Sequence, residues 1–340
     1  MKICIYGLGA IGGLIAARLA NQGIDVCAVA RGATLEALRR DGLTLIEGLA
    51  DQPMRRQFNI RASDDPAELG VQDVVVVSVK ATAMPAVAAG IAPLLGPDTT
   101  VLSTMNGVPW WFFHGMDPAL AKLRLDTLDP DGRIAAAIPA ERVVGTVTHL
   151  SAANQGPGVV RHVAGNGILV GEPSGGAQTP RSQAIVAVLR QAGFEIGESA
   201  SIQQDIWYKL WGNMTVNPVS GLTGATTDQL LDDDYVRHFM SRCMREAAAI
   251  GGRIGITIDN DPEERHQVTR RLGAFRTSML QDVEAGKPVE LDALVGAVLE
   301  IARQVNVEAP NIEALMGLSR LHAHLRGLYP AYLPGANTSA

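Results

Sequence analysis

Aromatic side chains are scarce in this sequence of 340 residues, at 4% of the chain. Glycine is abundant, with 36 residues, while hydrophobic residues make up 47% and charged residues 19%. This composition is typical of a globular protein and excludes a disordered one. A glycine-rich, aliphatic core favours alternating strands and helices over an all-β sandwich. At roughly 150 residues per domain, the length predicts about two domains.

Cysteine is also scarce. The chain has three, Cys4, Cys27 and Cys243, which are odd in number and far apart. They form neither a disulfide framework nor the spacing of a zinc site, and such usage fits the reducing cytoplasm. No His, Cys or Asp cluster has the spacing of metal ligands, so we predict no metal.

The sequence lacks an excess of positive charge and lacks long apolar runs. Lys and Arg number 29 against 35 Asp and Glu, which gives a net charge of −6 and nothing that favours a nucleic acid. The longest apolar runs, such as residues 74–77, are far shorter than the ~20 residues that span a bilayer. The first six residues lead directly to Gly7, which leaves no room for a signal peptide of ~15–30 residues. We therefore expect a cytoplasmic protein that binds neither membrane nor nucleic acid.

The first thirty residues have the pattern of a strand, a helix and a second strand. Residues 3–6 and 25–30 are apolar runs, and residues 14–21 between them have an apolar helical face that ends before Gly23. Such a unit predicts a parallel sheet with a right-handed crossover. The β-branched run at residues 74–79 predicts a strand buried on both faces, and residues 99–103 predict another.

The pattern of the sequence changes at about Arg142 and again after about Arg181. Short β-type runs at residues 143–148, 158–163 and 168–171 predict a small antiparallel extension of the sheet. The turn-rich residues 171–179 are the candidate linker. Beyond Arg181 the patterns predict helices, at residues 185–191, 202–214, 236–250, 265–285 and 291–304. The tail at residues 327–340 is expected to be loose.

Three glycines, Gly7, Gly9 and Gly12, form a G-x-G-x-x-G match between the first strand and the first helix. In this context, the first allows a tight turn, the second lets the backbone approach a pyrophosphate, and the third lets helix and strand pack closely. The free amides of the helix N-terminus then favour phosphate. The pattern predicts dinucleotide binding, and the alternative is a tight turn without a ligand.

Arg31 follows the second strand, where an NAD site usually carries an acidic residue for the ribose hydroxyl. A guanidinium suits a 2′-phosphate. The chain carries no acidic residue at this position, so a 2′-phosphate would not be repelled. Lys80, which follows the run at residues 74–79, is a candidate second cation for the same pocket. We predict NADP(H) in preference to NAD(H), and the alternative for Arg31 is a solvated surface residue.

Lys209, Asn213 and Asn217 are spaced four residues apart in a predicted helix. At ~100° per residue they share one face, with a drift of about 40° per step. A lysine and two carboxamides among apolar neighbours suit a carboxylate or carbonyl substrate. The alternative is a polar outer face of the helix.

Taken together, these pieces resemble the ketopantoate reductase (2-dehydropantoate 2-reductase) family over nearly the whole chain. The resemblance rests on their order and spacing, because no single piece is specific. The matching pieces are Gly7–Gly12, Arg31, Val79-Lys80-Ala81, Asn106-Gly107, Gly145-Thr146, Thr148-His149, residues 209–218, residues 278–282 and Glu290-Leu291-Asp292.

The resemblance implies an α/β fold, with a Rossmann-type NADP-binding domain at residues 1–180 and an all-α substrate domain at residues 181–326. It places the active site in the cleft between them. It also implies that Lys209 is the general acid that protonates the ketone oxygen as hydride arrives from NADPH, and that Glu290 helps to keep Lys209 charged. Without the resemblance, Glu290 and Ser278 would be taken as helix-surface residues.

The resemblance assigns further contacts residue by residue. The expected cofactor-binding residues are Gly7, Leu8, Gly9, Ala10, Ile11, Gly12, Arg31, Lys80, Asn106, Ser151 and Glu290. The expected substrate-binding residues are Asn106, Lys209, Asn213, Asn217, Thr227 and Ser278. Thr227 is a departure, since many relatives carry an asparagine there. His149 or His114 as the acid is the less favoured alternative to Lys209.

A second departure concerns the loop after Asn106-Gly107, which has four aromatic residues in a row, Trp110 to Phe113. We interpret them as a local hydrophobic cluster or a dimer contact, and the alternative is a reshaped substrate pocket. The family includes monomers and dimers, so a homodimer is one of the two expected assemblies.

The expected reaction is the NADPH-dependent reduction of a small 2-oxo acid, 2-dehydropantoate to (R)-pantoate, in pantothenate biosynthesis. Two alternatives stay open. One is a paralogue that reduces a different 2-oxo acid or oxidises a 2-hydroxy acid. The other is a non-catalytic NADP(H)-binding sensor.

Overall fold

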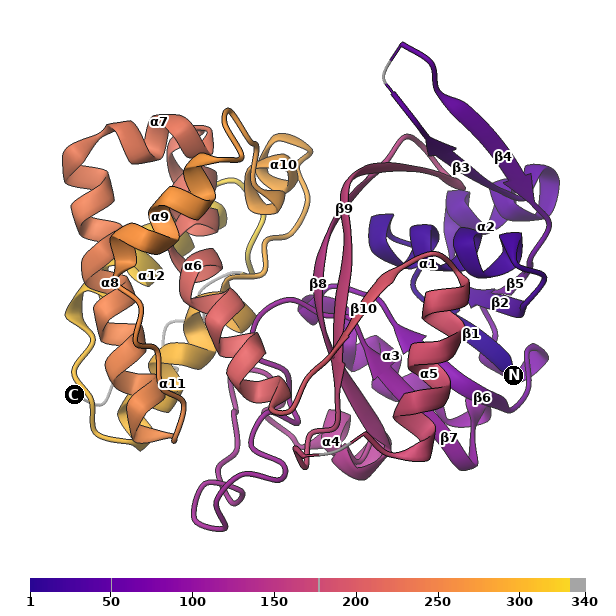
Figure 1. Ribbon diagram of the computed structural model, residues 1–340, viewed down its shortest axis with the longest axis horizontal. Helices are drawn as coiled ribbons and strands as arrows, with labels where there is room; N and C mark the ends of the chain where they lie inside the picture. Colours follow the sequence, from indigo (N-terminus) through magenta and orange to yellow (C-terminus); the bar gives the residue numbers. More distant parts are fainter. Residues whose placement is uncertain (50, 177, 331–340) are drawn as a thin grey trace. The chain divides into compact units, whose positions relative to one another are not determined.

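The computed structural model describes residues 1–49, 51–176 and 178–330, and the chain divides into two compact units (Figure 1). Unit 1 comprises Met1–Ile206 and unit 2 comprises Trp207–Ala340. The boundary lies inside helix α6 (Ile202–Thr223) and not near residue 180. The reason is that strand β10 (Glu195–Glu198) pairs with strand β9 (Val159–Gly171) of the sheet of unit 1, and helix α5 (Pro180–Gln191) contacts both strands. Residues 181–206, expected in the helical domain, therefore belong to unit 1.

Unit 1 is built on one mixed sheet, in the order β4-β3-β9-β8-β7-β6-β1-β2-β5 with β10 beside β9. The neighbours β7-β6-β1-β2 run parallel, as the strand–helix–strand pattern predicts. The strands are β1 (Lys2–Tyr6), β2 (Asp25–Val29), β3 (Leu43–Glu47), β4 (Met54–Phe58), β5 (Arg61–Ser63), β6 (Gln72–Val77), β7 (Leu95–Ser103), β8 (Val143–Asn154) and β9 (Val159–Gly171). The other helices of this unit are α1 (Ala10–Asn21), α2 (Gly32–Asp41), α3 (Met84–Gly90) and α4 (Arg133–Ala137).

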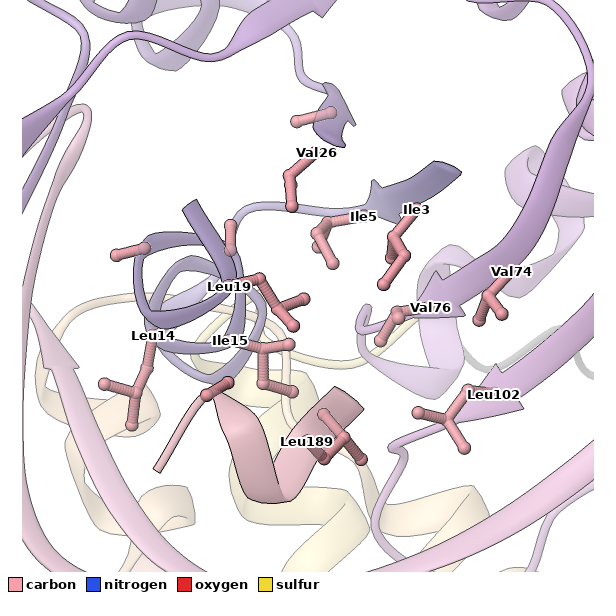
Figure 2. Packing of buried hydrophobic residues seen from close by; sticks show 14 of the residues in the cluster. Ile3, Ile5, Leu14, Ile15, Leu19, Val26, Val74, Val76, Leu102 and Leu189 are labelled. Atoms are coloured by element: carbon pink, nitrogen blue, oxygen red, sulfur yellow. The ribbon is translucent and has the colours of Figure 1, made fainter. Parts of the chain in front are cut away.

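The core of unit 1 lies between the sheet and helices α1 and α5 (Figure 2). Ile5 of β1 and Val76 of β6 point toward Ile15 of α1, and Leu189 of α5 closes the same cluster. The alternate strand residues, such as Val75, are buried as well and lie on the opposite face of the sheet. Strand β6 is therefore covered on both faces of the sheet, which confirms the prediction from the β-branched run.

Strands β8 and β9 pair antiparallel along most of their length, with register shifts after His149 and Ser151. This pairing confirms that the predicted extension of the sheet is antiparallel. The runs at residues 158–163 and 168–171, expected as separate strands, form the single strand β9. Gly165 adopts a φ of +68° at the first register shift. The pairing of β9 with β8 continues on both sides of it, so this glycine does not end the strand.

The four consecutive aromatics after Asn106 are largely interior residues of unit 1. Trp111, Phe112 and Phe113 are buried, with the two phenylalanine rings edge to face at 5.5 Å. The indole of Trp110 donates to the Ile138 carbonyl at 3.1 Å. A Cβ atom at Gly145 would lie 2.5 Å from the Trp111 ring, so this glycine makes room for the indole. The structure supports the local hydrophobic cluster, and the homodimer stays a prediction.

Unit 2 is helical in its described part and contains most of α6. The helices that follow are α7 (Thr227–Asp232), α8 (Asp234–Arg253), α9 (Pro262–Arg270), α10 (Ser278–Glu284), α11 (Ala297–Gln304) and α12 (Pro310–Leu325), with a π-helical turn at Asp292–Gly296. Helix α8 contacts α7, α9, α11 and α12. The single helix expected at residues 265–285 is two helices, because Gly273 turns with a φ of +64° and Thr277 caps α10.

The expected loose tail begins later than residue 327. Leu328 is buried and its carbonyl accepts from the Val289 amide at 3.1 Å, and the Tyr329 hydroxyl donates to Asp292. Residues 331–340 lie outside the described residues. Across the described part of the chain, no helix combines the length and the apolar character needed to traverse a bilayer.

Candidate active site

The glycine loop lies at the carboxyl end of β1, between neighbours β6 and β2, where the strand order reverses and ligands of such sheets bind. Gly7 has a φ of +98°, and a Cβ atom there would lie 2.4 Å from Val79. A Cβ atom at Gly12 would lie 2.2 Å from the Gly7 carbonyl oxygen. A Cβ atom at Gly9 would meet only the Ser78 carbonyl oxygen, at 3.9 Å. Gly7 and Gly12 are therefore required by packing, whereas Gly9 leaves space for a ligand.

Helix α1 begins directly after this loop. Gly9 is its N-cap residue, no side chain caps it, and its first turn holds no acidic residue. The first amides of a helix have no partner within the helix, and together with the helix dipole they favour an anion. The loop and helix thus offer a backbone site for phosphate, with Leu8, Ala10 and Ile11 between the three glycines.

A pocket of about 230 Å³ lies beside the loop, lined by residues 6–8, 29–31 and 86–87 together with Thr34, Val79 and Ala83. Arg31 is exposed at this pocket and begins α2 as its N-cap residue. Tyr6 is buried at the same pocket; burial raises its pKa, and the charge of Arg31 opposes that shift. A cation at the rim of an otherwise apolar pocket fits a ligand with an apolar ring and an anionic group. Tyr6 and Thr34 were not among the predicted residues.

Lys80 and Asn106 follow the ends of the neighbouring strands β6 and β7. Lys80 comes directly after the pocket residue Val79 and begins a 3₁₀ turn at Ala81–Ala83. Asn106 is partly exposed in the loop after β7. Ser151 lies in β8, paired with Ala164, and is not among the residues that line the pocket. The structure thus places Lys80 beside the glycine loop and shows no such closeness for Ser151.

In unit 2, Lys209, Asn213 and Asn217 all lie on α6, as their spacing predicts. Lys209 and Asn213 are partly exposed, and Asn217 is buried. Apolar residues between them, including Leu210 and Met214, fill the core of the unit. The three polar side chains therefore form a stripe on a helix whose apolar residues are mostly buried.

Lys209 has a perturbed acidity. Burial lowers its pKa to about 8; the nearby Glu290 carboxylate opposes this, and the Arg265 guanidinium adds to it. A carboxylate close to an amine keeps the charged form, whereas removal from water and a second cation favour the neutral form. An amine with a pKa near neutrality can both give and take a proton, which is the requirement for a general acid or base.

Ser278 lies next to Asn217. The Asn217 amide donates to the Ser278 hydroxyl at 3.5 Å, which joins α6 to the first turn of α10. Thr277 caps α10 by accepting from the Leu280 amide, and this cap sets the position of Ser278. Thr227 is fully buried, and its hydroxyl donates to the Gly273 carbonyl at 2.6 Å. Thr227 therefore anchors the segment that leads to α10, and its hydroxyl already has a partner.

Sequence reasoning missed Arg265 of α9. Its guanidinium lies against Gly212 of α6, where a Cβ atom would be 2.9 Å from Nε. It also lies 5.9 Å from the Tyr208 ring centroid. The available signal was Gly212 itself, since an isolated glycine inside a helical pattern usually has a packing or functional reason.

The chain matches two family descriptions over most of its length. Residues 3–175 match "Ketopantoate reductase PanE/ApbA" and residues 201–323 match "Ketopantoate reductase PanE/ApbA C terminal". A 2-dehydropantoate 2-reductase from Mesorhizobium japonicum is 42% identical over 330 residues, which cover 97% of this chain and 100% of that protein.

Solved structures also resemble the chain over nearly its whole length. A candidate ketopantoate reductase from Ralstonia solanacearum has a TM-score of 0.91 and 52% identity, covering 96% of this chain and 99% of that one. A D-mandelate dehydrogenase solved with NADH and anilino(oxo)acetate has a TM-score of 0.80, with the same 96% of this chain and 100% of that one covered. At 18% identity, the second likeness concerns the fold alone.

Proposed function

The chain belongs to the ketopantoate reductase family, whose members are oxidoreductases acting on CH–OH groups, and we propose that it reduces 2-dehydropantoate to (R)-pantoate with NADPH. The observation that carries the proposal is Lys209, whose pKa is lowered to about 8 on the same helix face as Asn213 and Asn217. A non-catalytic sensor has no use for a tuned proton donor in this position.

The residues of unit 1 fit a dinucleotide phosphate. Gly9 leaves the space that a pyrophosphate needs, the first amides of α1 point to it, and the pocket beside Arg31 can take the adenosine. Arg31 and Lys80 would hold the 2′-phosphate, which makes NADPH the preferred form. When bound, this cofactor supplies the hydride.

Lys209 would hold and deliver the proton. Addition of hydride to a ketone produces an alkoxide, which is far more basic than any side chain. The Lys209 ammonium, placed at the ketone oxygen, stabilises that developing charge and transfers a proton to it. Glu290 supports the charged form of Lys209 before reaction, because its carboxylate raises the pKa that burial lowers.

Asn213, Asn217 and Ser278 would bind and orient the substrate. Two carboxamides and a hydroxyl provide donors and acceptors for the hydroxyl and carbonyl oxygens of a small oxo acid. The contact between Asn217 and Ser278 fixes one side of the site before substrate arrives. Thr227 contributes indirectly, by anchoring the segment before α10.

The proposal is tested by a substrate panel in which NADPH oxidation is followed by absorbance. We expect kcat/KM for 2-dehydropantoate to exceed that for pyruvate, 2-oxoisovalerate and phenylglyoxylate, and NADPH to be preferred over NADH. A slow rate with 2-dehydropantoate beside a fast rate with another acid would identify a paralogue with a different substrate. NADPH binding without oxidation across the panel would identify a sensor.

A further inference from the structure

The side chain of Arg265 is partly buried and makes no ion pair with a carboxylate of the described residues. Its Nε atom is fully buried and has no hydrogen-bond partner among the described residues. Burial lowers its pKa; among the described residues the influence that opposes this is Tyr208, and no carboxylate contributes. A buried guanidinium without a carboxylate is costly, because desolvation is not offset by an ion pair. Such a cation calls for an anion that is supplied from outside the chain.

The location of Arg265 is set by α6. Gly212 lies three residues after Lys209 and therefore on the same side of the helix. The guanidinium occupies the space above Gly212. A Cβ atom at Gly212 would lie 2.9 Å from Nε and 3.1 Å from Nη2 of Arg265. The Tyr208 ring lies at 5.9 Å, within the range of a cation–π contact. Arg265 is thus held beside the turn that carries Lys209.

The charges at this place are not balanced. The groups that act on the Lys209 ammonium are one carboxylate, Glu290, and one guanidinium, Arg265. With Lys209 protonated, these three groups sum to one positive charge. A single monoanion would neutralise the group, and a 2-oxo acid is a monoanion at neutral pH.

We propose that Arg265 binds the carboxylate of the substrate and thereby presents the adjacent ketone to Lys209, a substrate contact that rests on the proposed function above. The carboxylate of a 2-oxo acid is bonded directly to the ketone carbon. A cation that binds the carboxylate next to Lys209 therefore fixes the ketone oxygen within reach of the ammonium. Arginine suits this task, since its fork matches both carboxylate oxygens. The enzyme is then selective for free acids over their neutral esters and lactones.

The test compares 2-dehydropantoate with its lactone, which has the same carbon skeleton but no negative charge. For Arg265→Met we expect KM for the acid to rise by about 10- to 100-fold, as for loss of a charge-assisted contact, with KM for the lactone within about threefold of wild type. Binding of pantoate and of pantolactone, measured by calorimetry, gives the same comparison without turnover. Arg271→Met, which removes an exposed arginine at the end of the same helix, is the control and should leave both substrates unchanged.

A second variant, at Gly212, keeps the charge of Arg265 but changes the position of its guanidinium. The added Cβ atom of Gly212→Ala would displace the guanidinium, and alanine is otherwise favourable within a helix, so the protein should fold. We expect a several-fold rise in KM for the acid and none for the lactone. Arg265→Met should also shift the alkaline fall of kcat/KM to higher pH, because Arg265 helps to lower the pKa of Lys209.

Three outcomes would overturn the assignment. Equal losses with acid and lactone would show a structural role, unchanged KM for the acid would show no role, and a rise confined to KM for NADPH would show a cofactor contact. Failure of the proposed function has a different signature, since the wild-type protein itself would then prefer another 2-oxo acid. The comparison would be repeated with that acid and its methyl ester, and the same outcomes would decide it.

Discussion

The candidate sites for charged ligands in the two units are built from different groups. In unit 1 the proposed phosphate site is made mainly of backbone, from three glycines and the uncapped first turn of α1, with the exposed side chain of Arg31 at the rim of a pocket. In unit 2 the proposed site is made of partly buried side chains, with Lys209 and Arg265 on adjoining helices and the Glu290 carboxylate opposing their effect on the pKa of Lys209. Backbone amides do not titrate, whereas buried side-chain charges perturb each other strongly. The affinity of unit 1 for the nucleotide should therefore depend little on pH. The pH dependence of the reaction should arise from the side chains of unit 2.

The largest expected effect separates the two units by function. Lys209→Ala should lower kcat by about 10²- to 10⁴-fold, the usual contribution of general acid catalysis. The Kd for NADPH, measured by fluorescence titration, should stay within about twofold, because the proposed nucleotide site lies in unit 1. Lys122→Ala, which removes an exposed lysine of unit 1, is the control. Turnover by Lys209→Ala within a few fold of wild type would exclude the acid role.

The next effect tests Arg31, one of the two side chains proposed to make the nucleotide site of unit 1 selective for NADPH. Arg31→Ala should weaken NADPH by about 10- to 100-fold, since a hydrogen-bonded charge pair is worth roughly 1.5–3 kcal/mol. NADH has no 2′-phosphate, so its Kd should change little. Arg39→Ala, on the exposed part of α2, should leave both cofactors unchanged. Equal loss of NADPH and NADH would contradict a contact with the 2′-phosphate.

A smaller effect distinguishes packing from binding within the glycine loop. Gly12→Ala places a Cβ atom 2.2 Å from the Gly7 carbonyl oxygen, so it should destabilise the fold by about 1–3 kcal/mol and lower the Tm. Gly9→Ala has only a distant neighbour, at 3.9 Å, and should keep the Tm of wild type while binding NADPH more weakly. If Gly9→Ala bound NADPH as wild type does, the pyrophosphate would not lie over this residue.

The same contrast explains how much could be predicted from sequence. The glycine loop, the buried strands and the stripe on α6 each depend on local spacing, and the structure places them as expected. Arg265 and Lys209 are 56 positions apart by their numbers in the chain, and no local pattern joins them. Their proximity arises from the packing of α9 on α6 at Gly212, which only a tertiary structure reveals.

Other differences also have tertiary causes. Residues 181–206 have helical patterns over much of their length, yet the pairing of β10 with β9 attaches them to the sheet of unit 1. The long pattern at residues 265–285 divides because Gly273 turns and Thr277 caps a new helix. Thr227 occupies the predicted place of a substrate contact, but its hydroxyl is bonded to Gly273. Periodicity indicates which residues can form an element, and it does not indicate which partner they meet.

The smallest expected effect concerns the pH dependence assigned to unit 2. In the proposed mechanism reduction requires protonated Lys209, so kcat/KM should fall as the pH rises through about 8. Glu290 raises the pKa of Lys209, and Glu290→Gln should therefore move this fall to lower pH, the opposite direction from Arg265→Met. The activity lost should be greatest near pH 8 and small at pH 6, where Lys209 is protonated in both proteins.

Glu313→Gln, at an exposed position of α12, serves as the control for charge loss in the same unit. A profile of Glu290→Gln that falls uniformly at every pH would indicate a contact with substrate or cofactor instead of an electrostatic effect on Lys209. Binding of NADPH should be flat over the same pH range in the wild-type protein down to about pH 7, because the second phosphate pKa lies near 6. Opposite shifts in the two variants, with flat cofactor binding, would assign the pH dependence to the side-chain site of unit 2.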